Sequence, residues 1–333
     1  MNPARLTNRR SAALLLVLLF AGNSAAADVL FDDDNGPLTG IFGVPDASEG
    51  AVFLAPAKSE WSLMTMMASH VTDDDRGDET LVFDGETTRV ELRYRRGVSE
   101  KLEVGVAVPF VWHESGSFDS AIDNWHDIFG LGGGSRPNRP DDVLEFRYGV
   151  AGNTVFDFRS NANGLGDVRL FAGWQLRSDA RHPLALRASV KLPTGDSDDF
   201  LGSGGTDVSI GIAGHVQEFY GVDGLSAFYR GNAVYLGEPD RLANQHRSFV
   251  GHIAAGLSYA FNDRFNVSTQ LWARSAMYDS NIEILGEPAV ALTIGATYRW
   301  SPQYAVTFGF SEDLKVGSVP DVAFQLGLRY QPN

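Results

Sequence analysis

Residues with the types needed for chemistry gather in one stretch of the sequence. Asp123, His126 and Asp127 are three and one positions apart, so on a helix they share one face. An imidazole between two carboxylates could bind a metal ion or orient a water molecule for hydrolysis. The same spacing also fits a solvated helix face, and the seven histidines include no His-Glu-x-x-His arrangement. We therefore predict no catalytic residue, metal ion or cofactor, and keep these three residues as candidates for an enzyme hypothesis.

Two acidic runs and two further histidines are the other candidates for chemistry. The runs are Asp73, Asp74, Asp75 and Asp78, and Asp196, Asp198 and Asp199. Crowded carboxylates attract Ca²⁺ or Mg²⁺, but neither run has the glycine and closing glutamate of an EF-hand. His215 and His252 fall on the polar face of predicted strands, and no Gly-x-Ser-x-Gly sequence occurs. The position of the two histidines and the lack of this sequence argue against a hydrolase.

A predicted helix would position the first candidate group. Its apolar residues are spaced four, three and four positions apart and are Phe118, Ile122, Trp125 and Phe129. That spacing places them on one face, and Gly130 would end the helix. The helix belongs to a long insertion, 113–164, in which 143–148 and 154–158 also predict a hairpin. We expect an extracellular insertion whose helix gates or narrows the opening of the structure that carries it.

The rest of the chain alternates apolar and polar residues with the period of a β-strand. Phe324, Leu326 and Leu328 form one face of the last segment, while Gln325 and Arg329 lie on the other. The same pattern begins near Trp61, Glu86, Leu102, Asp167, Leu184, Asp207, Leu225, Phe249, Phe265, Val290, Tyr304 and Val322. About twelve strands of this kind predict an all-β fold over residues 60–333. That fold is a transmembrane antiparallel up-and-down β-barrel with a short helix in a long extracellular loop.

The predicted connections alternate in length. Short ones occupy 97–101, 178–183, 262–263 and 301–302, and long polar ones occupy 71–85, 113–142, 194–206, 237–247 and 275–287. Outer-membrane barrels have short periplasmic turns and longer extracellular loops. The lengths therefore predict the orientation of the barrel as well as its fold.

The N-terminal residues predict export. Three arginines precede the apolar run Ala12–Ala21, and Ala25 to Ala27 supply a small-residue cleavage site, so residues 1–27 are predicted to be a signal peptide. Loss of those three positive charges changes the formal net charge from −15 to −18, which argues against nucleic acid as a partner. After residue 27 no apolar run reaches the length of a membrane helix. Residues 28–59 are predicted to form a periplasmic or lumen-docked segment, and we expect the protein in the bacterial outer membrane.

Charged residues fall on the polar face of the predicted strands. The lumen-lining set is Arg89, Glu91, Arg93, Glu103, Arg169, Arg187, Lys191, Arg299 and Arg329. Charges at membrane depth must face water or one another. Two interpretations follow, a wet channel lined by both signs or a set of paired charges that fills a narrow barrel.

Several segments of the sequence resemble one proteobacterial family. They are Phe118–Leu131, Gly164–Leu170, Lys191–Asp199, Asp84–Thr87 and Ile41–Pro45. Together they resemble the family called domain of unknown function 3187 over nearly all of the chain after the predicted signal peptide. The resemblance implies an outer-membrane barrel and carries no established activity.

Three functions remain open from the sequence. The first is a passive channel or transporter for small solutes, gated by the loop helix. The second is an enzyme that modifies lipid or lipopolysaccharide, and the third is a closed structural or adhesion barrel. In each case we expect contact with outer-membrane lipids and lipopolysaccharide, and with the barrel-assembly machinery during biogenesis. The sequence leaves the oligomeric state open.

Overall fold

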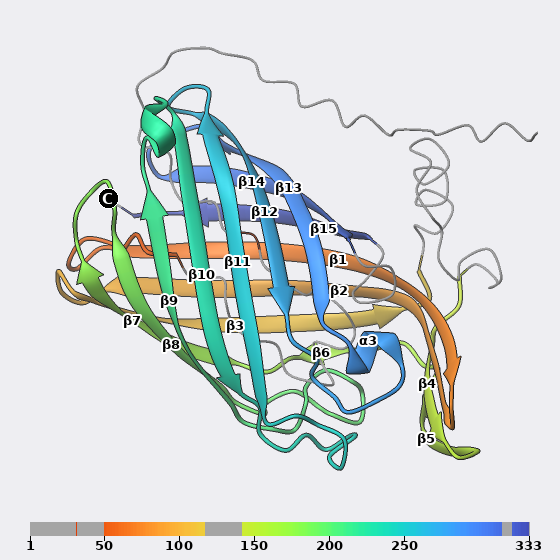
Figure 1. Cartoon of the computed structure of the whole chain (residues 1–333). Coiled ribbons are helices and arrows are strands. Elements are labelled where there is room, and N and C mark those ends of the chain that lie inside the picture. Colours follow the sequence, from red (N-terminus) through yellow and green to blue (C-terminus); the bar gives the residue numbers. More distant parts are fainter. Residues whose placement is uncertain (1–30, 32–49, 117–141, 315–321, 333) are drawn as a thin grey trace, which may run out of the picture.

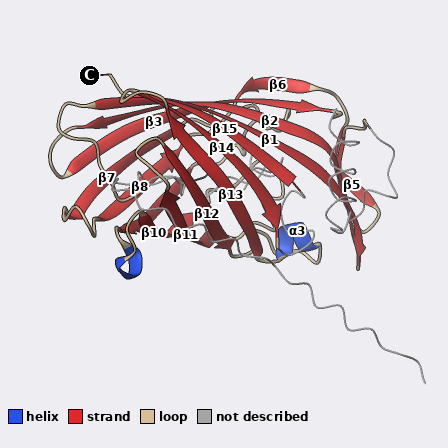
Figure 2. Cartoon of the chain, turned by 90° about the horizontal axis from the view of Figure 1, so that it is seen from above, coloured by secondary structure: helices blue, strands red, loops and turns tan. Residues whose placement is uncertain are grey.

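Twelve strands form a closed antiparallel barrel in the part of the chain that the structure describes. The computed structural model describes residues 31, 50–116, 142–314 and 322–332. The strands of the barrel are β1 (Ser59–Arg76), β2 (Glu79–Gly97), β3 (Leu102–Glu114), β7 (Arg169–Arg177), β8 (Leu184–Lys191), β9 (Asp207–Val216), β10 (Leu225–Tyr235), β11 (Phe249–Ala260), β12 (Phe265–Arg274), β13 (Ala289–Arg299), β14 (Tyr304–Asp313) and β15 (Val322–Tyr330). Each pairs with the next in this order, and β15 pairs with β1, which closes the ring (Figures 1 and 2). The predicted fold class is confirmed.

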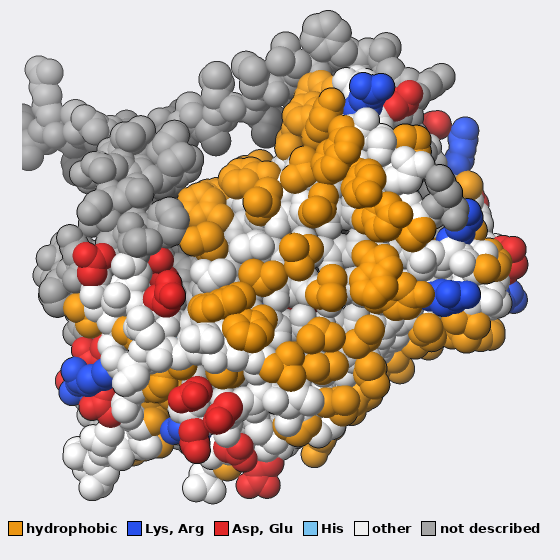
Figure 3. Space-filling view, turned by 180° about the vertical axis from the view of Figure 1, so that it is seen from behind, with side chains coloured by type: hydrophobic (Ala, Val, Ile, Leu, Met, Phe, Trp, Pro, Cys, Tyr) orange, Lys and Arg blue, Asp and Glu red, His pale blue; other side chains and the backbone are white. Residues whose placement is uncertain are grey.

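The barrel is polar inside and apolar outside. Along β15, Phe324 and Leu326 are exposed on the outer surface, whereas Gln325 between them is 1% exposed. Figure 3 shows the result, an outer wall covered with hydrophobic side chains and charged groups gathered near its ends. Alternation with period two therefore separates a lipid-compatible face from a polar interior.

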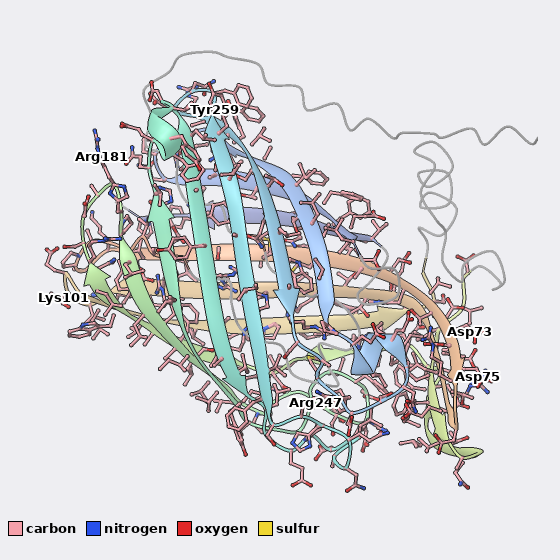
Figure 4. All side chains as sticks on the ribbon, in the orientation of Figure 1. Asp73, Asp75, Lys101, Arg181, Arg247 and Tyr259 are labelled. Carbon is pink, nitrogen blue, oxygen red and sulfur yellow. The ribbon has the colours of Figure 1, made fainter. Side chains whose placement is uncertain are left out.

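The two ends of the barrel differ. Residues 98–101, 178–183, 261–264 and 300–303 connect strands at one end, which we call the short-turn end, and β1 begins and β15 ends there. The connections at the other end, which we call the long-loop end, include 192–206, 236–248 and 275–288. Lys101, Arg181 and Tyr259 mark the short-turn end in Figure 4, and Asp73, Asp75 and Arg247 mark the long-loop end. The short-turn end corresponds to the predicted periplasmic side.

One predicted loop is wrong. Residues 71–85 were expected to be a long polar loop, but β1 and β2 continue through them and pair up to Arg76 and Glu79. Only Gly77 and Asp78 turn the chain, and Gly77 has the positive φ of 68° that such a turn requires. The strands extend here because Leu81 and Phe83 are buried against other residues of the long-loop end.

Shorter elements lie at the long-loop end. The segments predicted to form a hairpin contain β4 (Glu145–Val150) and β5 (Asn153–Phe158), and β4 pairs with the extended part of β2. The short strand β6 (Ala162–Leu165) pairs with β3, and the one-turn helix α3 (Glu283–Gly286) lies between β12 and β13. The 3₁₀ turn η2 (Phe219–Gly221) lies at the opposite end. Figure 1 shows β1 and β2 curving away from the barrel together with β4 and β5.

Candidate functional site: the polar interior of the barrel

The inner wall contains buried carboxylates that are each held by arginines. Glu91 is 1% exposed, and its Oε1 lies 2.6 Å from Nη2 of Arg93. Its other oxygen accepts a hydrogen bond from Arg169, which is 78 residues away in the sequence. Alternation puts all three residues on the inner face, and the pairing of β2 with β3 and of β3 with β7 brings them together.

A second buried carboxylate joins the wall to the residues before β1. Oε1 of Glu103, which is 0% exposed, lies 2.8 Å from Nη1 of Arg187 and 3.6 Å from Nη1 of Arg95. Its Oε2 accepts a hydrogen bond of 2.9 Å from the backbone N–H of Leu54. Glu103 therefore binds the wall and the N-terminal segment at the same time.

The third group of buried charges anchors a long loop. Nζ of Lys191 lies 2.9 Å from Asp167 and 2.9 Å from Asp207, and it also donates to Oγ of Ser203. The backbone N–H groups of Gly195 and Ser203 each donate to Asp167 at 3.0 Å. The segment Lys191–Asp199 thus contains both the buried ammonium group and part of the loop that folds over it. Among the described residues, the carboxylates that contact Lys191 therefore have a structural role.

Residues that precede the barrel strands lie inside the barrel. The carbonyl oxygen of Gly50 accepts hydrogen bonds from Arg187, and that of Ala51 accepts one of 3.2 Å from Gln175. Phe53 packs under the guanidinium of Arg187, 4.2 Å from the ring centre. This part of the segment predicted as periplasmic or lumen-docked therefore contacts the inner wall.

Phe31 occupies a second place on the inner wall. Its side chain is 0% exposed, its carbonyl accepts hydrogen bonds from Gln270 and Arg230, and its N–H donates to Gln270. A Cβ on Gly309 would lie 2.9 Å from the Phe31 ring, so the absence of a side chain there leaves room for the ring. Phe31 and Gly50 thus fix two points of the chain inside the barrel.

A cavity of about 1060 Å³ lies at the short-turn end. It is lined by the wall strands β1, β2, β13, β14 and β15, by the turns at 263–264 and 300–303, and by residues 50 and 52–55. Its charged lining residues are Lys58, Glu60, Glu91, Arg93, Arg95, Asp263, Arg264, Arg299 and Arg329.

An apolar cluster lies at the long-loop end. Its fully buried members are Leu81, Phe83, Leu144, Phe146, Tyr148, Phe156, Phe200, Val234, Leu236, Leu242, Val250, Met277, Tyr278, Ile282, Ile284 and Leu285. The cluster joins β2 to β11, which stand on opposite sides of the ring of strands. Arg76 near the tip of the β1–β2 hairpin pairs at 2.6 Å with Glu283 of the α3 loop. We call this cluster the apolar cap, because it crosses the mouth of the barrel.

Two tyrosines of the apolar cap have raised pKa values. The hydroxyl of Tyr148 donates to Glu79 at 3.0 Å, and burial raises the pKa of Tyr148 to about 12. Burial raises the pKa of Tyr278 well above 10, and the nearby charge of Asp207 adds to the effect. Both hydroxyl groups therefore stay neutral at neutral pH.

The structure describes only some of the predicted site residues. His126, Asp123 and Asp127, and the proposed gating residues Phe118, Ile122, Trp125 and Phe129, lie outside the described residues. His215 and His252 are buried on the inner wall, at 4% and 1% exposed. No cluster of His, Cys, Asp or Glu suited to a metal ion occurs among the residues described.

Six of the nine residues predicted from the sequence to line the lumen are buried, and further arginines are buried as well. Arg89, Glu91, Glu103, Arg169, Arg187 and Lys191 are each at most 9% exposed. Sequence reasoning missed Arg230 and Arg274, which are buried on β10 and β12. Extending the period-two pattern from Ser226 and Gln270 would have placed both on the inner face. No sequence pattern marks Phe31 or Phe53 as residues of the interior.

A solved structure of an outer-membrane channel has a similar fold. The COG4313 outer membrane channel from Pseudomonas putida F1 aligns with a TM-score of 0.54 and 13% identity, over 84% of this chain and 96% of that chain. The KdgM porin gives 0.43 and 10% over 82% and 99%, and the Ralstonia pickettii toluene transporter TbuX gives 0.42 and 12% over 90% and 98%. At 13% identity the likeness to the first of these structures concerns the fold alone.

The remaining comparisons concern the sequence and its helices. No helix within the described ranges has the length and apolar character needed to cross a membrane. No curated protein matches the chain. Residues 28–331 match the family described as protein of unknown function DUF3187. Because this match spans the barrel and the segment before it, the chain belongs to the DUF3187 family.

Proposed function

We propose that this protein is an outer-membrane channel that lets small solutes cross passively through its interior. The observation that carries the proposal is the cavity of about 1060 Å³, which lies between strands of the inner wall, the turns of the short-turn end and the N-terminal segment. A barrel that served only as a scaffold would gain nothing from a cavity of this size next to buried charges. Cavities that hold small molecules have volumes of roughly 300–1,000 Å³.

Two parts of the protein would control passage. Residues 50–55 narrow the interior where Arg187, Glu103 and Gln175 hold them. The apolar cap narrows the long-loop end, and its loops are fastened by the ion pair of Arg76 with Glu283. Opening would require these contacts to break, so we propose a gated channel that is closed in this conformation.

The helix predicted at Phe118–Phe129 completes the proposed gate. It lies in the connection between β3 and β4, whose ends stand beside the apolar cap. Its apolar face would pack on the cap, and its acidic face would meet water. We also propose lipopolysaccharide as a contact of the outer surface and the barrel-assembly machinery as a partner during insertion.

Solute flux into proteoliposomes tests the channel directly. The refolded chain starting at residue 28 is reconstituted beside a variant that lacks residues 117–131. We expect size-limited uptake of small sugars and ions, which becomes faster in the variant because part of the gate is gone. Vesicles that stay impermeable with both proteins, although both migrate as folded barrels in gels, would contradict the proposal and favour a closed structural barrel.

A further inference from the structure

The charge of the cavity is opposite to the charge of the chain. The whole chain has 42 acidic and 27 basic residues, whereas the described residues that line the cavity include three carboxylates and six cationic side chains. Its cations are Lys58, Arg93, Arg95, Arg264, Arg299 and Arg329. A surface chosen only for solubility in water would not concentrate arginines inside an acidic protein. The reversal indicates a site for an anion.

Three of the arginines form a row across five neighbouring strands. Arg299 on β13 stands opposite Ala305 on β14, which stands opposite Arg329 on β15. Arg329 stands opposite Ser62 on β1, which in turn faces Arg93 on β2. Neighbouring strands are about 4.8 Å apart, so the arginines are spaced at about 10 Å, with small side chains between them. The small residues leave open space between long cationic side chains.

Part of this positive charge has no carboxylate partner among the described residues. Glu91 pairs with Arg93, and Glu60 lies 3.1 Å from Arg95 and 3.8 Å from Arg329. Arg299 donates to the backbone carbonyl of Asp263 at 3.1 Å, which satisfies a hydrogen bond without neutralising the charge. Arg329 is also repelled by Arg299 and Arg95. An added carboxylate at this place would relieve the repulsion and accept hydrogen bonds from guanidinium groups.

Carboxylates near the other cations are also few. Within the described ranges, no carboxylate oxygen lies within 4.0 Å of the charged nitrogens of Arg299, Arg264 or Lys58. All three residues line the cavity. Arg299 on β13 and Arg264 in the turn 261–264 lie side by side, because the backbone N–H of Arg299 donates to the carbonyl oxygen of Arg264, whereas Lys58 lies just before β1.

Part of the cavity lining, which we call the apolar floor, comes from the N-terminal segment. It is formed by Val52, Phe53 and Leu54, and Val52 is 46% exposed. One face of the Phe53 ring is taken by Arg187. An inorganic anion would leave these side chains facing water, whereas an organic anion would cover them and remove apolar surface from water.

We propose that this cavity binds small organic carboxylates, with the carboxylate at Arg299 and Arg329 and the apolar body over Val52 and Phe53. This site would specify the kind of solute that the proposed channel accepts. It rests on the proposed function only because the ligand would reach it through the channel. The ligand class follows from two parts of one cavity lining, a cationic row and an apolar floor.

Equilibrium binding to the full mature chain, refolded in detergent, tests this site without any membrane. Isothermal titration calorimetry is done with benzoate, with benzyl alcohol and with inorganic phosphate. The variant is Arg299→Gln with Arg329→Gln. The matched control is Arg181→Gln, at an exposed arginine of the short-turn end that does not line the cavity.

We expect saturable binding of benzoate that weakens about tenfold in the double variant and is unchanged in the control. Benzyl alcohol should bind weakly because it lacks the charge, and phosphate weakly because it cannot cover the floor. Absent benzoate binding, or equal binding by the double variant, would overturn the site. Binding of phosphate as tight as that of benzoate would overturn the role of the apolar floor, and equal binding of benzyl alcohol would overturn the role of the arginines. Benzoate binding together with impermeable vesicles would refute the channel and leave the site standing.

Discussion

The guanidinium carbon of Arg187 lies 4.2 Å from the centre of the Phe53 ring. Arg187 belongs to the wall strand β8, and Phe53 belongs to the segment that precedes the first strand. The same arginine donates to Gly50 and to Glu103, so one side chain joins the N-terminal segment to a buried carboxylate of the wall. The interior of this barrel is therefore organised around its own N-terminal residues.

Substitution of Arg187 should release that segment. In Arg187→Gln, the contact with Phe53 and the charged partner of Glu103 are both lost, so local opening should become about tenfold more frequent. Lys58 is the only lysine or arginine between residues 28 and 58, so cleavage by trypsin after Lys58 reports the opening. Arg181→Gln is the control and should be cut at the wild-type rate. Equal rates for Arg187→Gln and wild type would show that Arg187 does not hold the segment.

Removal of Lys191 should destabilise the barrel strongly. Lys191→Met leaves Asp167 and Asp207 buried without their ammonium partner, and breaking such a group costs about 3–5 kcal/mol. Urea unfolding followed by tryptophan fluorescence measures the loss. Adding Asp167→Asn and Asp207→Asn to Lys191→Met removes the uncompensated charge and should restore much of the stability. A triple variant as unstable as the single one would mean that the charges are not the cause.

Phe31 and Gly309 should be coupled in stability. Gly309→Val places atoms where the Phe31 ring now lies, so the valine should cost less once Phe31→Ala has vacated that space. A double-mutant cycle of unfolding free energies should give a coupling of about 0.5–3 kcal/mol. Gly251→Val is the control, because a Cβ on Gly251 would meet nothing within 4 Å. Additive effects of Phe31→Ala and Gly309→Val would show that the Phe31 ring does not lie against Gly309.

High pH should loosen the apolar cap. A folded-state pKa of about 12 for Tyr148 lies above the usual value of 10, so the folded protein retains the proton more strongly than the unfolded chain. The stabilisation is complete below pH 10 and is lost as the pH rises from 10 to 12. Near-ultraviolet circular dichroism should show the cap losing order in that range, and less so in Tyr148→Phe, with Tyr278 causing the remainder. An identical alkaline transition in Tyr148→Phe would exclude Tyr148 as a cause.

The sequence predicts the wall of the barrel well because one physical rule governs it. Each strand must face lipid on one side and water on the other, so alternation locates eleven of the twelve starts to within two residues of the structure. The exception is β2, which begins at Glu79 and was expected near Glu86. Asp73, Asp74 and Asp75 resemble a loop, but β1 has left the barrel at this point and its residues no longer need to alternate.

The interior is harder to predict for a different reason. Alternation shows that Glu91 and Arg169 both face inward, but their contact depends on which residues stand opposite each other across three strands. Register is set by the closure of the whole ring and is not encoded in any one strand. The place of Phe31 follows from a pocket left by Gly309 on a strand almost 280 positions later, which no local pattern reveals.

Single-channel conductance in a planar bilayer tests the central proposal most directly. The mature chain is compared with a variant that lacks residues 28–55, which removes the apolar floor of the cavity and two partners of Arg187, Gly50 and Phe53, but leaves β1 intact. A channel narrowed by its own N-terminal segment predicts small or rare current steps for the mature chain and larger, longer ones for the variant. A folded variant with no current steps at any voltage would contradict the channel and leave a barrel filled by its own paired charges.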